Sequence, residues 1–127
     1  MNGGEKEAWQ AHKAALERFY NDVCTVYEYR DVKDEETKIT GKEEVAVLVG
    51  EPCRISFQSP VAAGLFGNAA EKKASIKLFL SPRATIKAGS KIVVTHEGET
   101  TAYGSSGVPG RFATHQEVAL ELFERWA

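Results

Sequence analysis

The sequence predicts one mainly β domain, a small antiparallel β-barrel with an N-terminal α-helix and a long inter-strand loop. The length of 127 residues suits a single domain, and 43% apolar with 27% charged residues is the ordinary balance of a globular protein. Short segments alternate apolar and polar side chains between turn residues, which is typical of an antiparallel barrel or sandwich. Within the domain 1–127 we expect a helix in 1–21 and the barrel in 22–127, with the long loop at 58–73.

Residues 5–20 have the spacing of an amphipathic helix. Alanine and glutamate are frequent, proline and glycine are absent, and bulky side chains recur three or four positions apart. Glu5 and Glu7 suit the positive end of the helix dipole, and Asn21-Asp22 is expected to end the helix. The side chains that form the predicted stripe are Trp9, His12, Leu16, Phe19 and Tyr20.

From Val23 onward the period of the apolar side chains changes to two, which predicts strands. The first two strands are expected to form a long hairpin whose turn is the polar segment 31–42. We expect Gly50-Glu51-Pro52 to break the second strand, with Val45, Val47 and Val49 on one face before the break and Cys53, Ile55 and Phe57 alternating with polar residues after it. The expected strands are 23–30, 43–49, 53–58, 75–80, 91–96 and 100–103.

The last segment has two interpretations. Residues 115–122 alternate as a strand does, yet Val118, Leu122, Phe123 and Trp126 also fit a helical stripe. Periodicity does not decide between them. We favour a strand that becomes irregular near Phe123.

The segment 58–73 does not fit a simple barrel. Loops beyond about 12–15 residues are usually functional or disordered, and this one is apolar, with no charged residue before Glu71. Exposed apolar surface in such a segment marks a partner site. The alternative is a compact loop or short helix that folds back on the barrel's own core.

Charge is unevenly distributed along the chain. Residues 1–44 carry a net charge of −4 and residues 51–97 a net charge of +4, although the whole chain carries only −2. Opposite blocks favour packing between copies or a basic strip that faces an anion, whereas the alternative is that folding mixes the blocks on the surface. No stretch approaches the roughly 20 apolar residues of a transmembrane helix, and no signal peptide is evident, so we expect a soluble intracellular protein.

The sequence predicts no catalytic or metal site. His12, His96 and His115 form no pair four residues apart, and Cys-x-x-Cys and His-x-x-x-His are absent. Cys24 and Cys53 stand in strand patterns and are expected to be buried free thiols. We therefore expect no enzymatic activity, no cofactor and no small-molecule substrate.

A basic stretch supports a rival interpretation, a single-stranded nucleic-acid-binding barrel. In such barrels aromatic side chains stack on bases and lysines follow the phosphates; Phe66 and Phe79 would be the aromatic residues. Against it, aromatic and basic residues are not interleaved on one strand face, and the net charge is negative. The basic residues concerned are Lys72, Lys73, Lys77, Arg83, Lys87 and Lys91.

Four parts of the sequence, taken together, resemble a known family. They are residues 15–27 (ALERFYNDVCTVY), 51–57 (EPCRISF), 76–82 with 86–92 (IKLFLSP and IKAGSKI), and 115–118 (HQEV). The chain resembles the small head–tail joining proteins, also called head-completion or stopper proteins, of tailed phages and of prophages in Gram-positive bacteria. The likeness runs over nearly the whole chain from about Ala14.

The resemblance implies a β-barrel subunit that joins a ring beneath the portal and adaptor of a filled capsid. In that family a long loop between two barrel strands projects into the central channel, and 58–73 has the matching position. By this resemblance Val61, Leu65 and Phe66 are candidates for contacts between loops or with the adaptor, and Lys72 and Lys73 are candidates for facing DNA. The apolar tip suits closure of a channel by mutual packing better than binding of phosphates.

The predicted function is therefore that of a structural virion protein of the phage neck, which joins head to tail and helps to retain packaged double-stranded DNA. Its expected partners are portal or adaptor ring proteins, tail-terminator or tail proteins, and further copies of itself, with no membrane. We expect the isolated chain to be largely monomeric, and to act in the host bacterial cytoplasm and then in the virion neck. The alternatives are the nucleic-acid-binding barrel and a tail-side joining protein.

Overall fold

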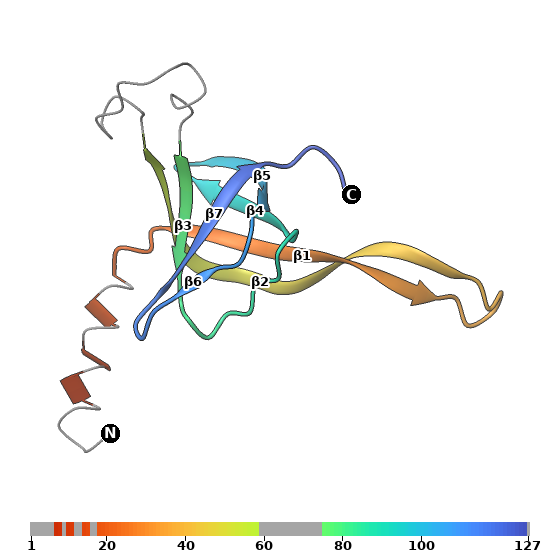
Figure 1. Ribbon diagram of the computed structural model, residues 1–127, viewed down its shortest axis with the longest axis horizontal. Coiled ribbons are helices and arrows are strands. Elements are labelled where there is room, and N and C mark those ends of the chain that lie inside the picture. The colour runs from red at the N-terminus through yellow and green to blue at the C-terminus, as the bar shows by residue number, and fades with distance from the viewer. Residues whose placement is uncertain (1–6, 9, 12–13, 16–17, 59–74, 127) are drawn as a thin grey trace.

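The computed structural model describes residues 7–8, 10–11, 14–15, 18–58 and 75–126 (Figure 1). Within them, seven strands form one antiparallel sheet in the order β3-β2-β1-β4-β5-β7-β6, and β3 also pairs with β7. These pairings close the sheet into a ring of hydrogen bonds, which we call the closed sheet, and they confirm the mainly β antiparallel prediction. The strands are β1 (Asp22–Lys33), β2 (Thr40–Gln58), β3 (Ser75–Leu80), β4 (Lys91–His96), β5 (Glu99–Ser105), β6 (Gly110–Arg111) and β7 (Gln116–Leu122).

Alternating side chains fill the interior of the closed sheet. Ile55, Leu78 and Val118 lie side by side across β2, β3 and β7, and all three are buried. The bounds of β3 and β4 agree with the predicted strands 75–80 and 91–96, because strands with one buried face keep a strict period of two. The buried apolar core consists of Cys24, Val26, Cys53, Ile55, Leu78, Leu80, Ala84, Ile86, Ile92, Val94, Tyr103, Val118 and Leu120.

The turn of the first hairpin is shorter than the predicted segment 31–42. β1 continues to Lys33 and β2 begins at Thr40. The Asp34 carboxylate closes the turn locally, since its Oδ1 accepts hydrogen bonds from the backbone N–H groups of Glu36 (2.8 Å) and Thr37 (3.2 Å). The flanking polar residues are thereby left in paired strands, where the sequence predicted a loop.

The break predicted at Gly50-Glu51-Pro52 is also wrong, because β2 continues through these residues. Gly50 has a φ of +64°, and the register between β1 and β2 shifts nearby, which are the marks of a β-bulge. The Gly50 N–H donates a hydrogen bond to Thr25 Oγ1 (3.3 Å). The bulge changes the alternation, so that Val49 is 74% exposed whereas Val45 and Val47, expected on the same face, are half-buried. Phe57, near the end of β2, is exposed as well.

β1 and β2 together extend well beyond the closed sheet. β4 pairs with β1 only over Val23–Tyr27, and β3 pairs with β2 only over Cys53–Gln58. Beyond Tyr27 the described strands pair only with each other and form a twisted two-stranded ribbon over residues 28–45, which we call the arm. Figure 1 shows the arm running away from β3 and β7.

The helix predicted over 1–21 is not confirmed. Residues 1–6, 9, 12–13 and 16–17 lie outside the described residues, and with them Trp9, His12 and Leu16 of the predicted stripe. The described part of the chain contains no helix with assigned bounds. Phe19 of the same stripe is 60% exposed, so the packing expected of it is not found at that position.

The C-terminal segment is a strand that becomes irregular where the sequence analysis placed the change. β7 ends at Leu122, and residues 123–126 follow without regular structure. The Phe123 N–H still donates to the Ala102 carbonyl (3.1 Å), which directs the segment along β5. Among the described residues, no helix has the length and apolarity that crossing a membrane requires.

Candidate partner-binding surfaces

The partner site predicted from the sequence falls on residues outside the described part. Its two ends are described, because Gln58 and Ser75 are paired across β2 and β3. The segment therefore connects two neighbouring antiparallel strands of the closed sheet, as an inter-strand loop was expected to do. The predicted residues that lie within 59–74 are Val61, Leu65, Phe66, Lys72 and Lys73.

The arm carries an exposed apolar side chain at its end. Ile39 follows the turn and is 68% exposed. Two hydrogen bonds hold its backbone: the Asp34 N–H donates to the Ile39 carbonyl (2.9 Å), and the Ile39 N–H donates to Thr37 Oγ1 (3.3 Å). Residues 31–38 add four carboxylates and two lysines. The end of the arm is thus a fixed apolar projection in net acidic surroundings.

Aromatic contacts tie the root of the arm to the C-terminal segment. The Trp126 ring stacks on Tyr29, with centroids 5.1 Å apart and an interplanar angle of 8°, and meets Phe123 edge-on at 5.1 Å. Trp126 Nε1 donates to Glu44 Oε1 (3.3 Å), and Lys91 Nζ donates to the same oxygen (2.8 Å). These contacts link the C-terminal segment after β7, β4 and the arm, and so hold the direction in which the arm leaves the closed sheet.

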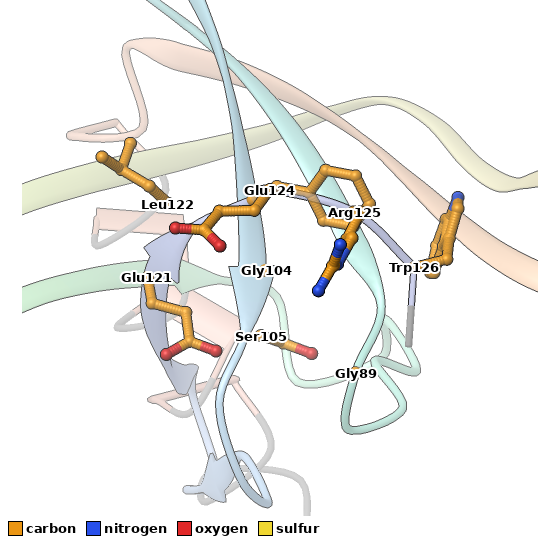
Figure 2. A pocket seen from close by; sticks show the side chains of 9 residues that line it. Gly89, Gly104, Ser105, Glu121, Leu122, Glu124, Arg125 and Trp126 are labelled. Carbon is orange, nitrogen blue, oxygen red and sulfur yellow. The ribbon is translucent and has the colours of Figure 1, made fainter.

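Two hollows, of about 460 and 390 Å³, flank Trp126 and share Gly89 as a lining residue. Figure 2 shows the larger one, with Glu121, Glu124 and Arg125 around it. The smaller one is lined by charges of both signs, namely Glu28, Arg30, Lys42 and Lys87. Because each hollow mixes acidic and basic groups, neither favours a ligand of one charge.

A third hollow, of about 230 Å³, lies on the outer face of the closed sheet and is lined largely by aromatic side chains. We call it the aromatic pocket. Arg54 and Phe79 are neighbours across β2 and β3 and face outward, because the residues beside them in each strand are buried. The Phe112 ring, at the edge, stacks on His115 at 4.7 Å and 13°. The lining residues are Phe19, Tyr20, Arg54, Phe79 and His115.

The sequence alone did not indicate the aromatic pocket. Its residues come from four separate parts of the chain, and only the pairing of β2, β3 and β7 brings them together. The one available signal was the outward position of Phe79 in a strand with alternating burial, since large aromatic residues at such positions need a neighbour to cover them.

The basic stretch noted in the sequence is divided in the structure. Lys91 and Lys87 lie at the root of the arm, where they pair with Glu44 (2.8 Å) and Glu28 (3.9 Å). Lys77 lies on the outer face of β3, one step from Phe79 and opposite Ser56. Part of the opposite charge of the two sequence blocks is therefore neutralised within the chain.

One buried carboxylate organises the start of β1. Asp22 Oδ2 accepts a hydrogen bond from the Ile55 N–H (2.9 Å), and its Oδ1 lies 2.7 Å from His96 Nδ1. The hydrogen bond with Asp22 raises the pKa of His96 above its ordinary 6.5, and the nearby carboxylates of Glu97 and Glu99 act in the same direction. The pair joins β1, β2 and β4 and is a structural latch.

Cys24 and Cys53 are buried free thiols, as predicted. The hydrogen bond between them and their burial raise the pKa of Cys53 far above its ordinary range, so this thiol stays protonated and unreactive. Within the described ranges, no three His, Cys, Asp or Glu side chains are grouped so as to hold a metal ion.

No protein-family model matches the sequence, and no curated protein matches it. Among solved structures, the chain is similar to protein xkdH of the phage-like element PBSX from Bacillus subtilis. The TM-score is 0.48 and the sequence identity 15%, and the aligned part covers 79% of this chain and 91% of that chain.

Proposed function

We propose that this chain is a structural protein of the phage neck, which joins the filled head to the tail and helps to retain packaged DNA. The observation that carries the proposal is the arm. A two-stranded ribbon is marginally stable in water on its own, yet this one extends beyond Tyr27 with Ile39 exposed at its end. Neighbouring subunits in an assembly would cover such an element, and the resemblance of the sequence to head–tail joining proteins supports the same function.

The proposal gives the closed sheet the role of a β-barrel subunit in a ring of copies. The segment 58–73 would point into the channel, with Val61, Leu65 and Phe66 in contacts between loops or with the adaptor, and Lys72 and Lys73 facing double-stranded DNA. Portal or adaptor ring proteins and tail-terminator or tail proteins are the proposed partners. The chain would act in the host bacterial cytoplasm during assembly and in the virion neck afterwards, without catalysis or a cofactor.

Deletion of the coding sequence from its prophage tests the proposal, with electron microscopy of the particles as the readout. We expect heads that carry no tails and lose their DNA, and recovery of normal particles when the wild-type chain is supplied in trans. Tailless heads that keep their DNA would favour the tail-side joining protein instead. Tailed particles with full heads would contradict both functions.

The loop is tested by supplying the Leu65→Asp, Phe66→Asp double variant in the same assay. If these side chains contact neighbours, the variant protein will not restore DNA retention although it is produced in folded form. Val108→Asp is the matched control, because Val108 is 89% exposed and lies between β5 and β6, outside the segment 58–73 of the sequence. If the double variant fully restored DNA retention, the proposed role of the loop in contacts with neighbours would be wrong.

A second candidate function, single-stranded nucleic-acid binding, is favoured by the aromatic pocket. Arg54 lies beside Phe79 there, and Lys77 shares the same outer face, so aromatic and basic side chains do meet. Fluorescence anisotropy with a labelled oligonucleotide at two salt concentrations tests it. Binding that weakens steeply with salt, and that Arg54→Gln reduces, would favour this function, because phosphate contacts release counterions. Against it, Lys87 and Lys91 of the basic stretch are already paired with the arm carboxylates Glu28 and Glu44.

A further inference from the structure

The aromatic pocket is a hollow in the outer face of the closed sheet, and the end of the arm carries an exposed apolar side chain. The pocket is a hollow of about 230 Å³ with Phe19 and Phe79 in its lining, and Phe19 is 60% exposed. Exposed aromatic surface of this kind marks an interaction site. Ile39 is an exposed branched side chain on a turn that hydrogen bonds hold in one conformation. A projection that is already ordered loses little conformational entropy when it enters a hollow.

The charges around the two features are complementary. Four carboxylates lie near the end of the arm, from Asp31, Asp34, Glu35 and Glu36, against the three ammonium groups of Lys33, Lys38 and Lys42, the last of which is paired with Asp31 across the two strands, so a small acidic excess remains. The pocket has the exposed Arg54 in its lining and Lys77 on the next step of the same face, so its surroundings are net basic in spite of one carboxylate, Glu117, opposite Phe79. Opposite charges at the rim of an apolar contact favour encounter and fix orientation.

An arm cannot fill the pocket of its own chain. The pocket lies on the outer face of β2 and β3, near the start of β7, whereas the arm leaves the closed sheet in the direction away from β3 and β7 (Figure 1). The aromatic contacts of Trp126 with Tyr29 hold that direction. The complementary surface for each arm is therefore on another molecule.

We propose that the arm of one copy docks on the aromatic pocket of a second copy, with Ile39 entering the pocket and the acidic residues of the turn facing Arg54. The contact joins two different surfaces, so every copy offers one arm and one pocket, and repetition of the contact builds a ring or a chain of copies. The inference rests on the proposed function, which supplies the ring of copies, and it identifies the contact by which neighbouring copies would bind in that ring.

The small size of the contact explains the expected behaviour of the free protein. Stable interfaces bury about 800 Å² on each partner, and the end of a two-stranded arm offers less than this. Copies in dilute solution are then largely monomeric, and they associate when neighbours already bound to one platform raise their effective concentration.

Disulfide trapping between two cysteine variants tests the contact. Ile39→Cys protein is mixed with isotope-labelled Phe112→Cys protein under mild oxidation, because Phe112 stacks on His115 at the edge of the pocket. The native thiols are buried and do not compete. Val108→Cys replaces Phe112→Cys in the matched control, since Val108 is 89% exposed and neither lines the pocket nor stacks on His115. Mixed dimers, identified by mass, should form clearly faster with Phe112→Cys than with Val108→Cys; equal rates would overturn the proposal.

A charge-reversal cycle tests the same contact without new cysteines. Sedimentation at high protein concentration should show that Ile39→Asp weakens self-association about tenfold or more, the loss expected for a central interface side chain. Arg54→Glu should weaken it as well, and Glu36→Lys combined with Arg54→Glu should restore part of the loss. Unchanged association in both single variants, with unchanged melting temperatures, would overturn the docking of arm on pocket.

The two proposals fail in different experiments. Trapping and sedimentation use the isolated chain, whereas the deletion assay uses phage particles. Specific trapping together with normal tailed particles in the deletion strain would leave the contact between copies standing and remove the neck function. No specific trapping, together with tailless heads that lose their DNA in the deletion strain, would support the neck function and show that the subunits meet through a different contact.

Discussion

The contacts of Trp126 with the arm predict how much the Trp126→Ala substitution lowers the free energy of local opening of the arm. Trp126→Ala removes a stacked ring contact with Tyr29 and an edge-on contact with Phe123, each about 0.5–1.5 kcal/mol. It also removes the hydrogen bond from Nε1 to Glu44, about 0.5–1.5 kcal/mol. The contact with Phe123 lies within the C-terminal segment and does not change when the arm opens, so the other two contacts set the effect. We expect local opening of the arm to become easier by about 1–3 kcal/mol, which is roughly 5- to 150-fold in the opening equilibrium.

Hydrogen exchange measured by mass spectrometry is the assay for this change. Amides of the arm should exchange faster in Trp126→Ala, while amides of β3 and β4 keep their protection, because those strands form the core. Trp126→Phe is the matched control, since it keeps a ring beside Tyr29 and loses only the hydrogen bond. Unchanged exchange in the arm, or an equal loss of protection in β3 and β4, would refute the assignment of Trp126 as the anchor of the arm.

Three further predictions concern the bulge, the latch and the thiols. Gly50→Ala should lower the free energy of unfolding in urea by about 1–2 kcal/mol, because the backbone is left-handed there, whereas Gly41→Ala should not. The Asp22 carboxylate raises the pKa of His96, so the latch stabilises the fold fully below about pH 6.5 and this contribution is lost as the pH rises through the raised pKa. Stability should fall in that window in the wild type and not in His96→Gln. Both native thiols should react with a disulfide reagent only on unfolding, since Cys53 is buried with a raised pKa; rapid reaction of the folded chain would contradict this.

The sequence by itself determined the mainly β class and the positions of β3 and β4. These elements are short and have one face in the core, so their alternation of apolar and polar residues is strict. The same reasoning identified Cys24 and Cys53 as buried thiols and the change near Phe123 from strand to irregular chain. The partner residues predicted in 58–73 remain predictions, because they lie outside the described residues.

Only the tertiary structure decided the course of β2 and the surfaces for partners. Gly50-Glu51-Pro52 is a local signal for a break, but β1 pairs with β2 on both sides of Gly50, through Glu51 and Pro52 to Cys53, where pairing with β3 begins, and so the strand continues as a bulge. The length of the arm depends on where the pairing of β4 with β1 ends, which is at Tyr27. No local pattern in the sequence indicates this point. The aromatic pocket joins Arg54, Phe79 and His115, which are distant in sequence and become neighbours through strand register alone.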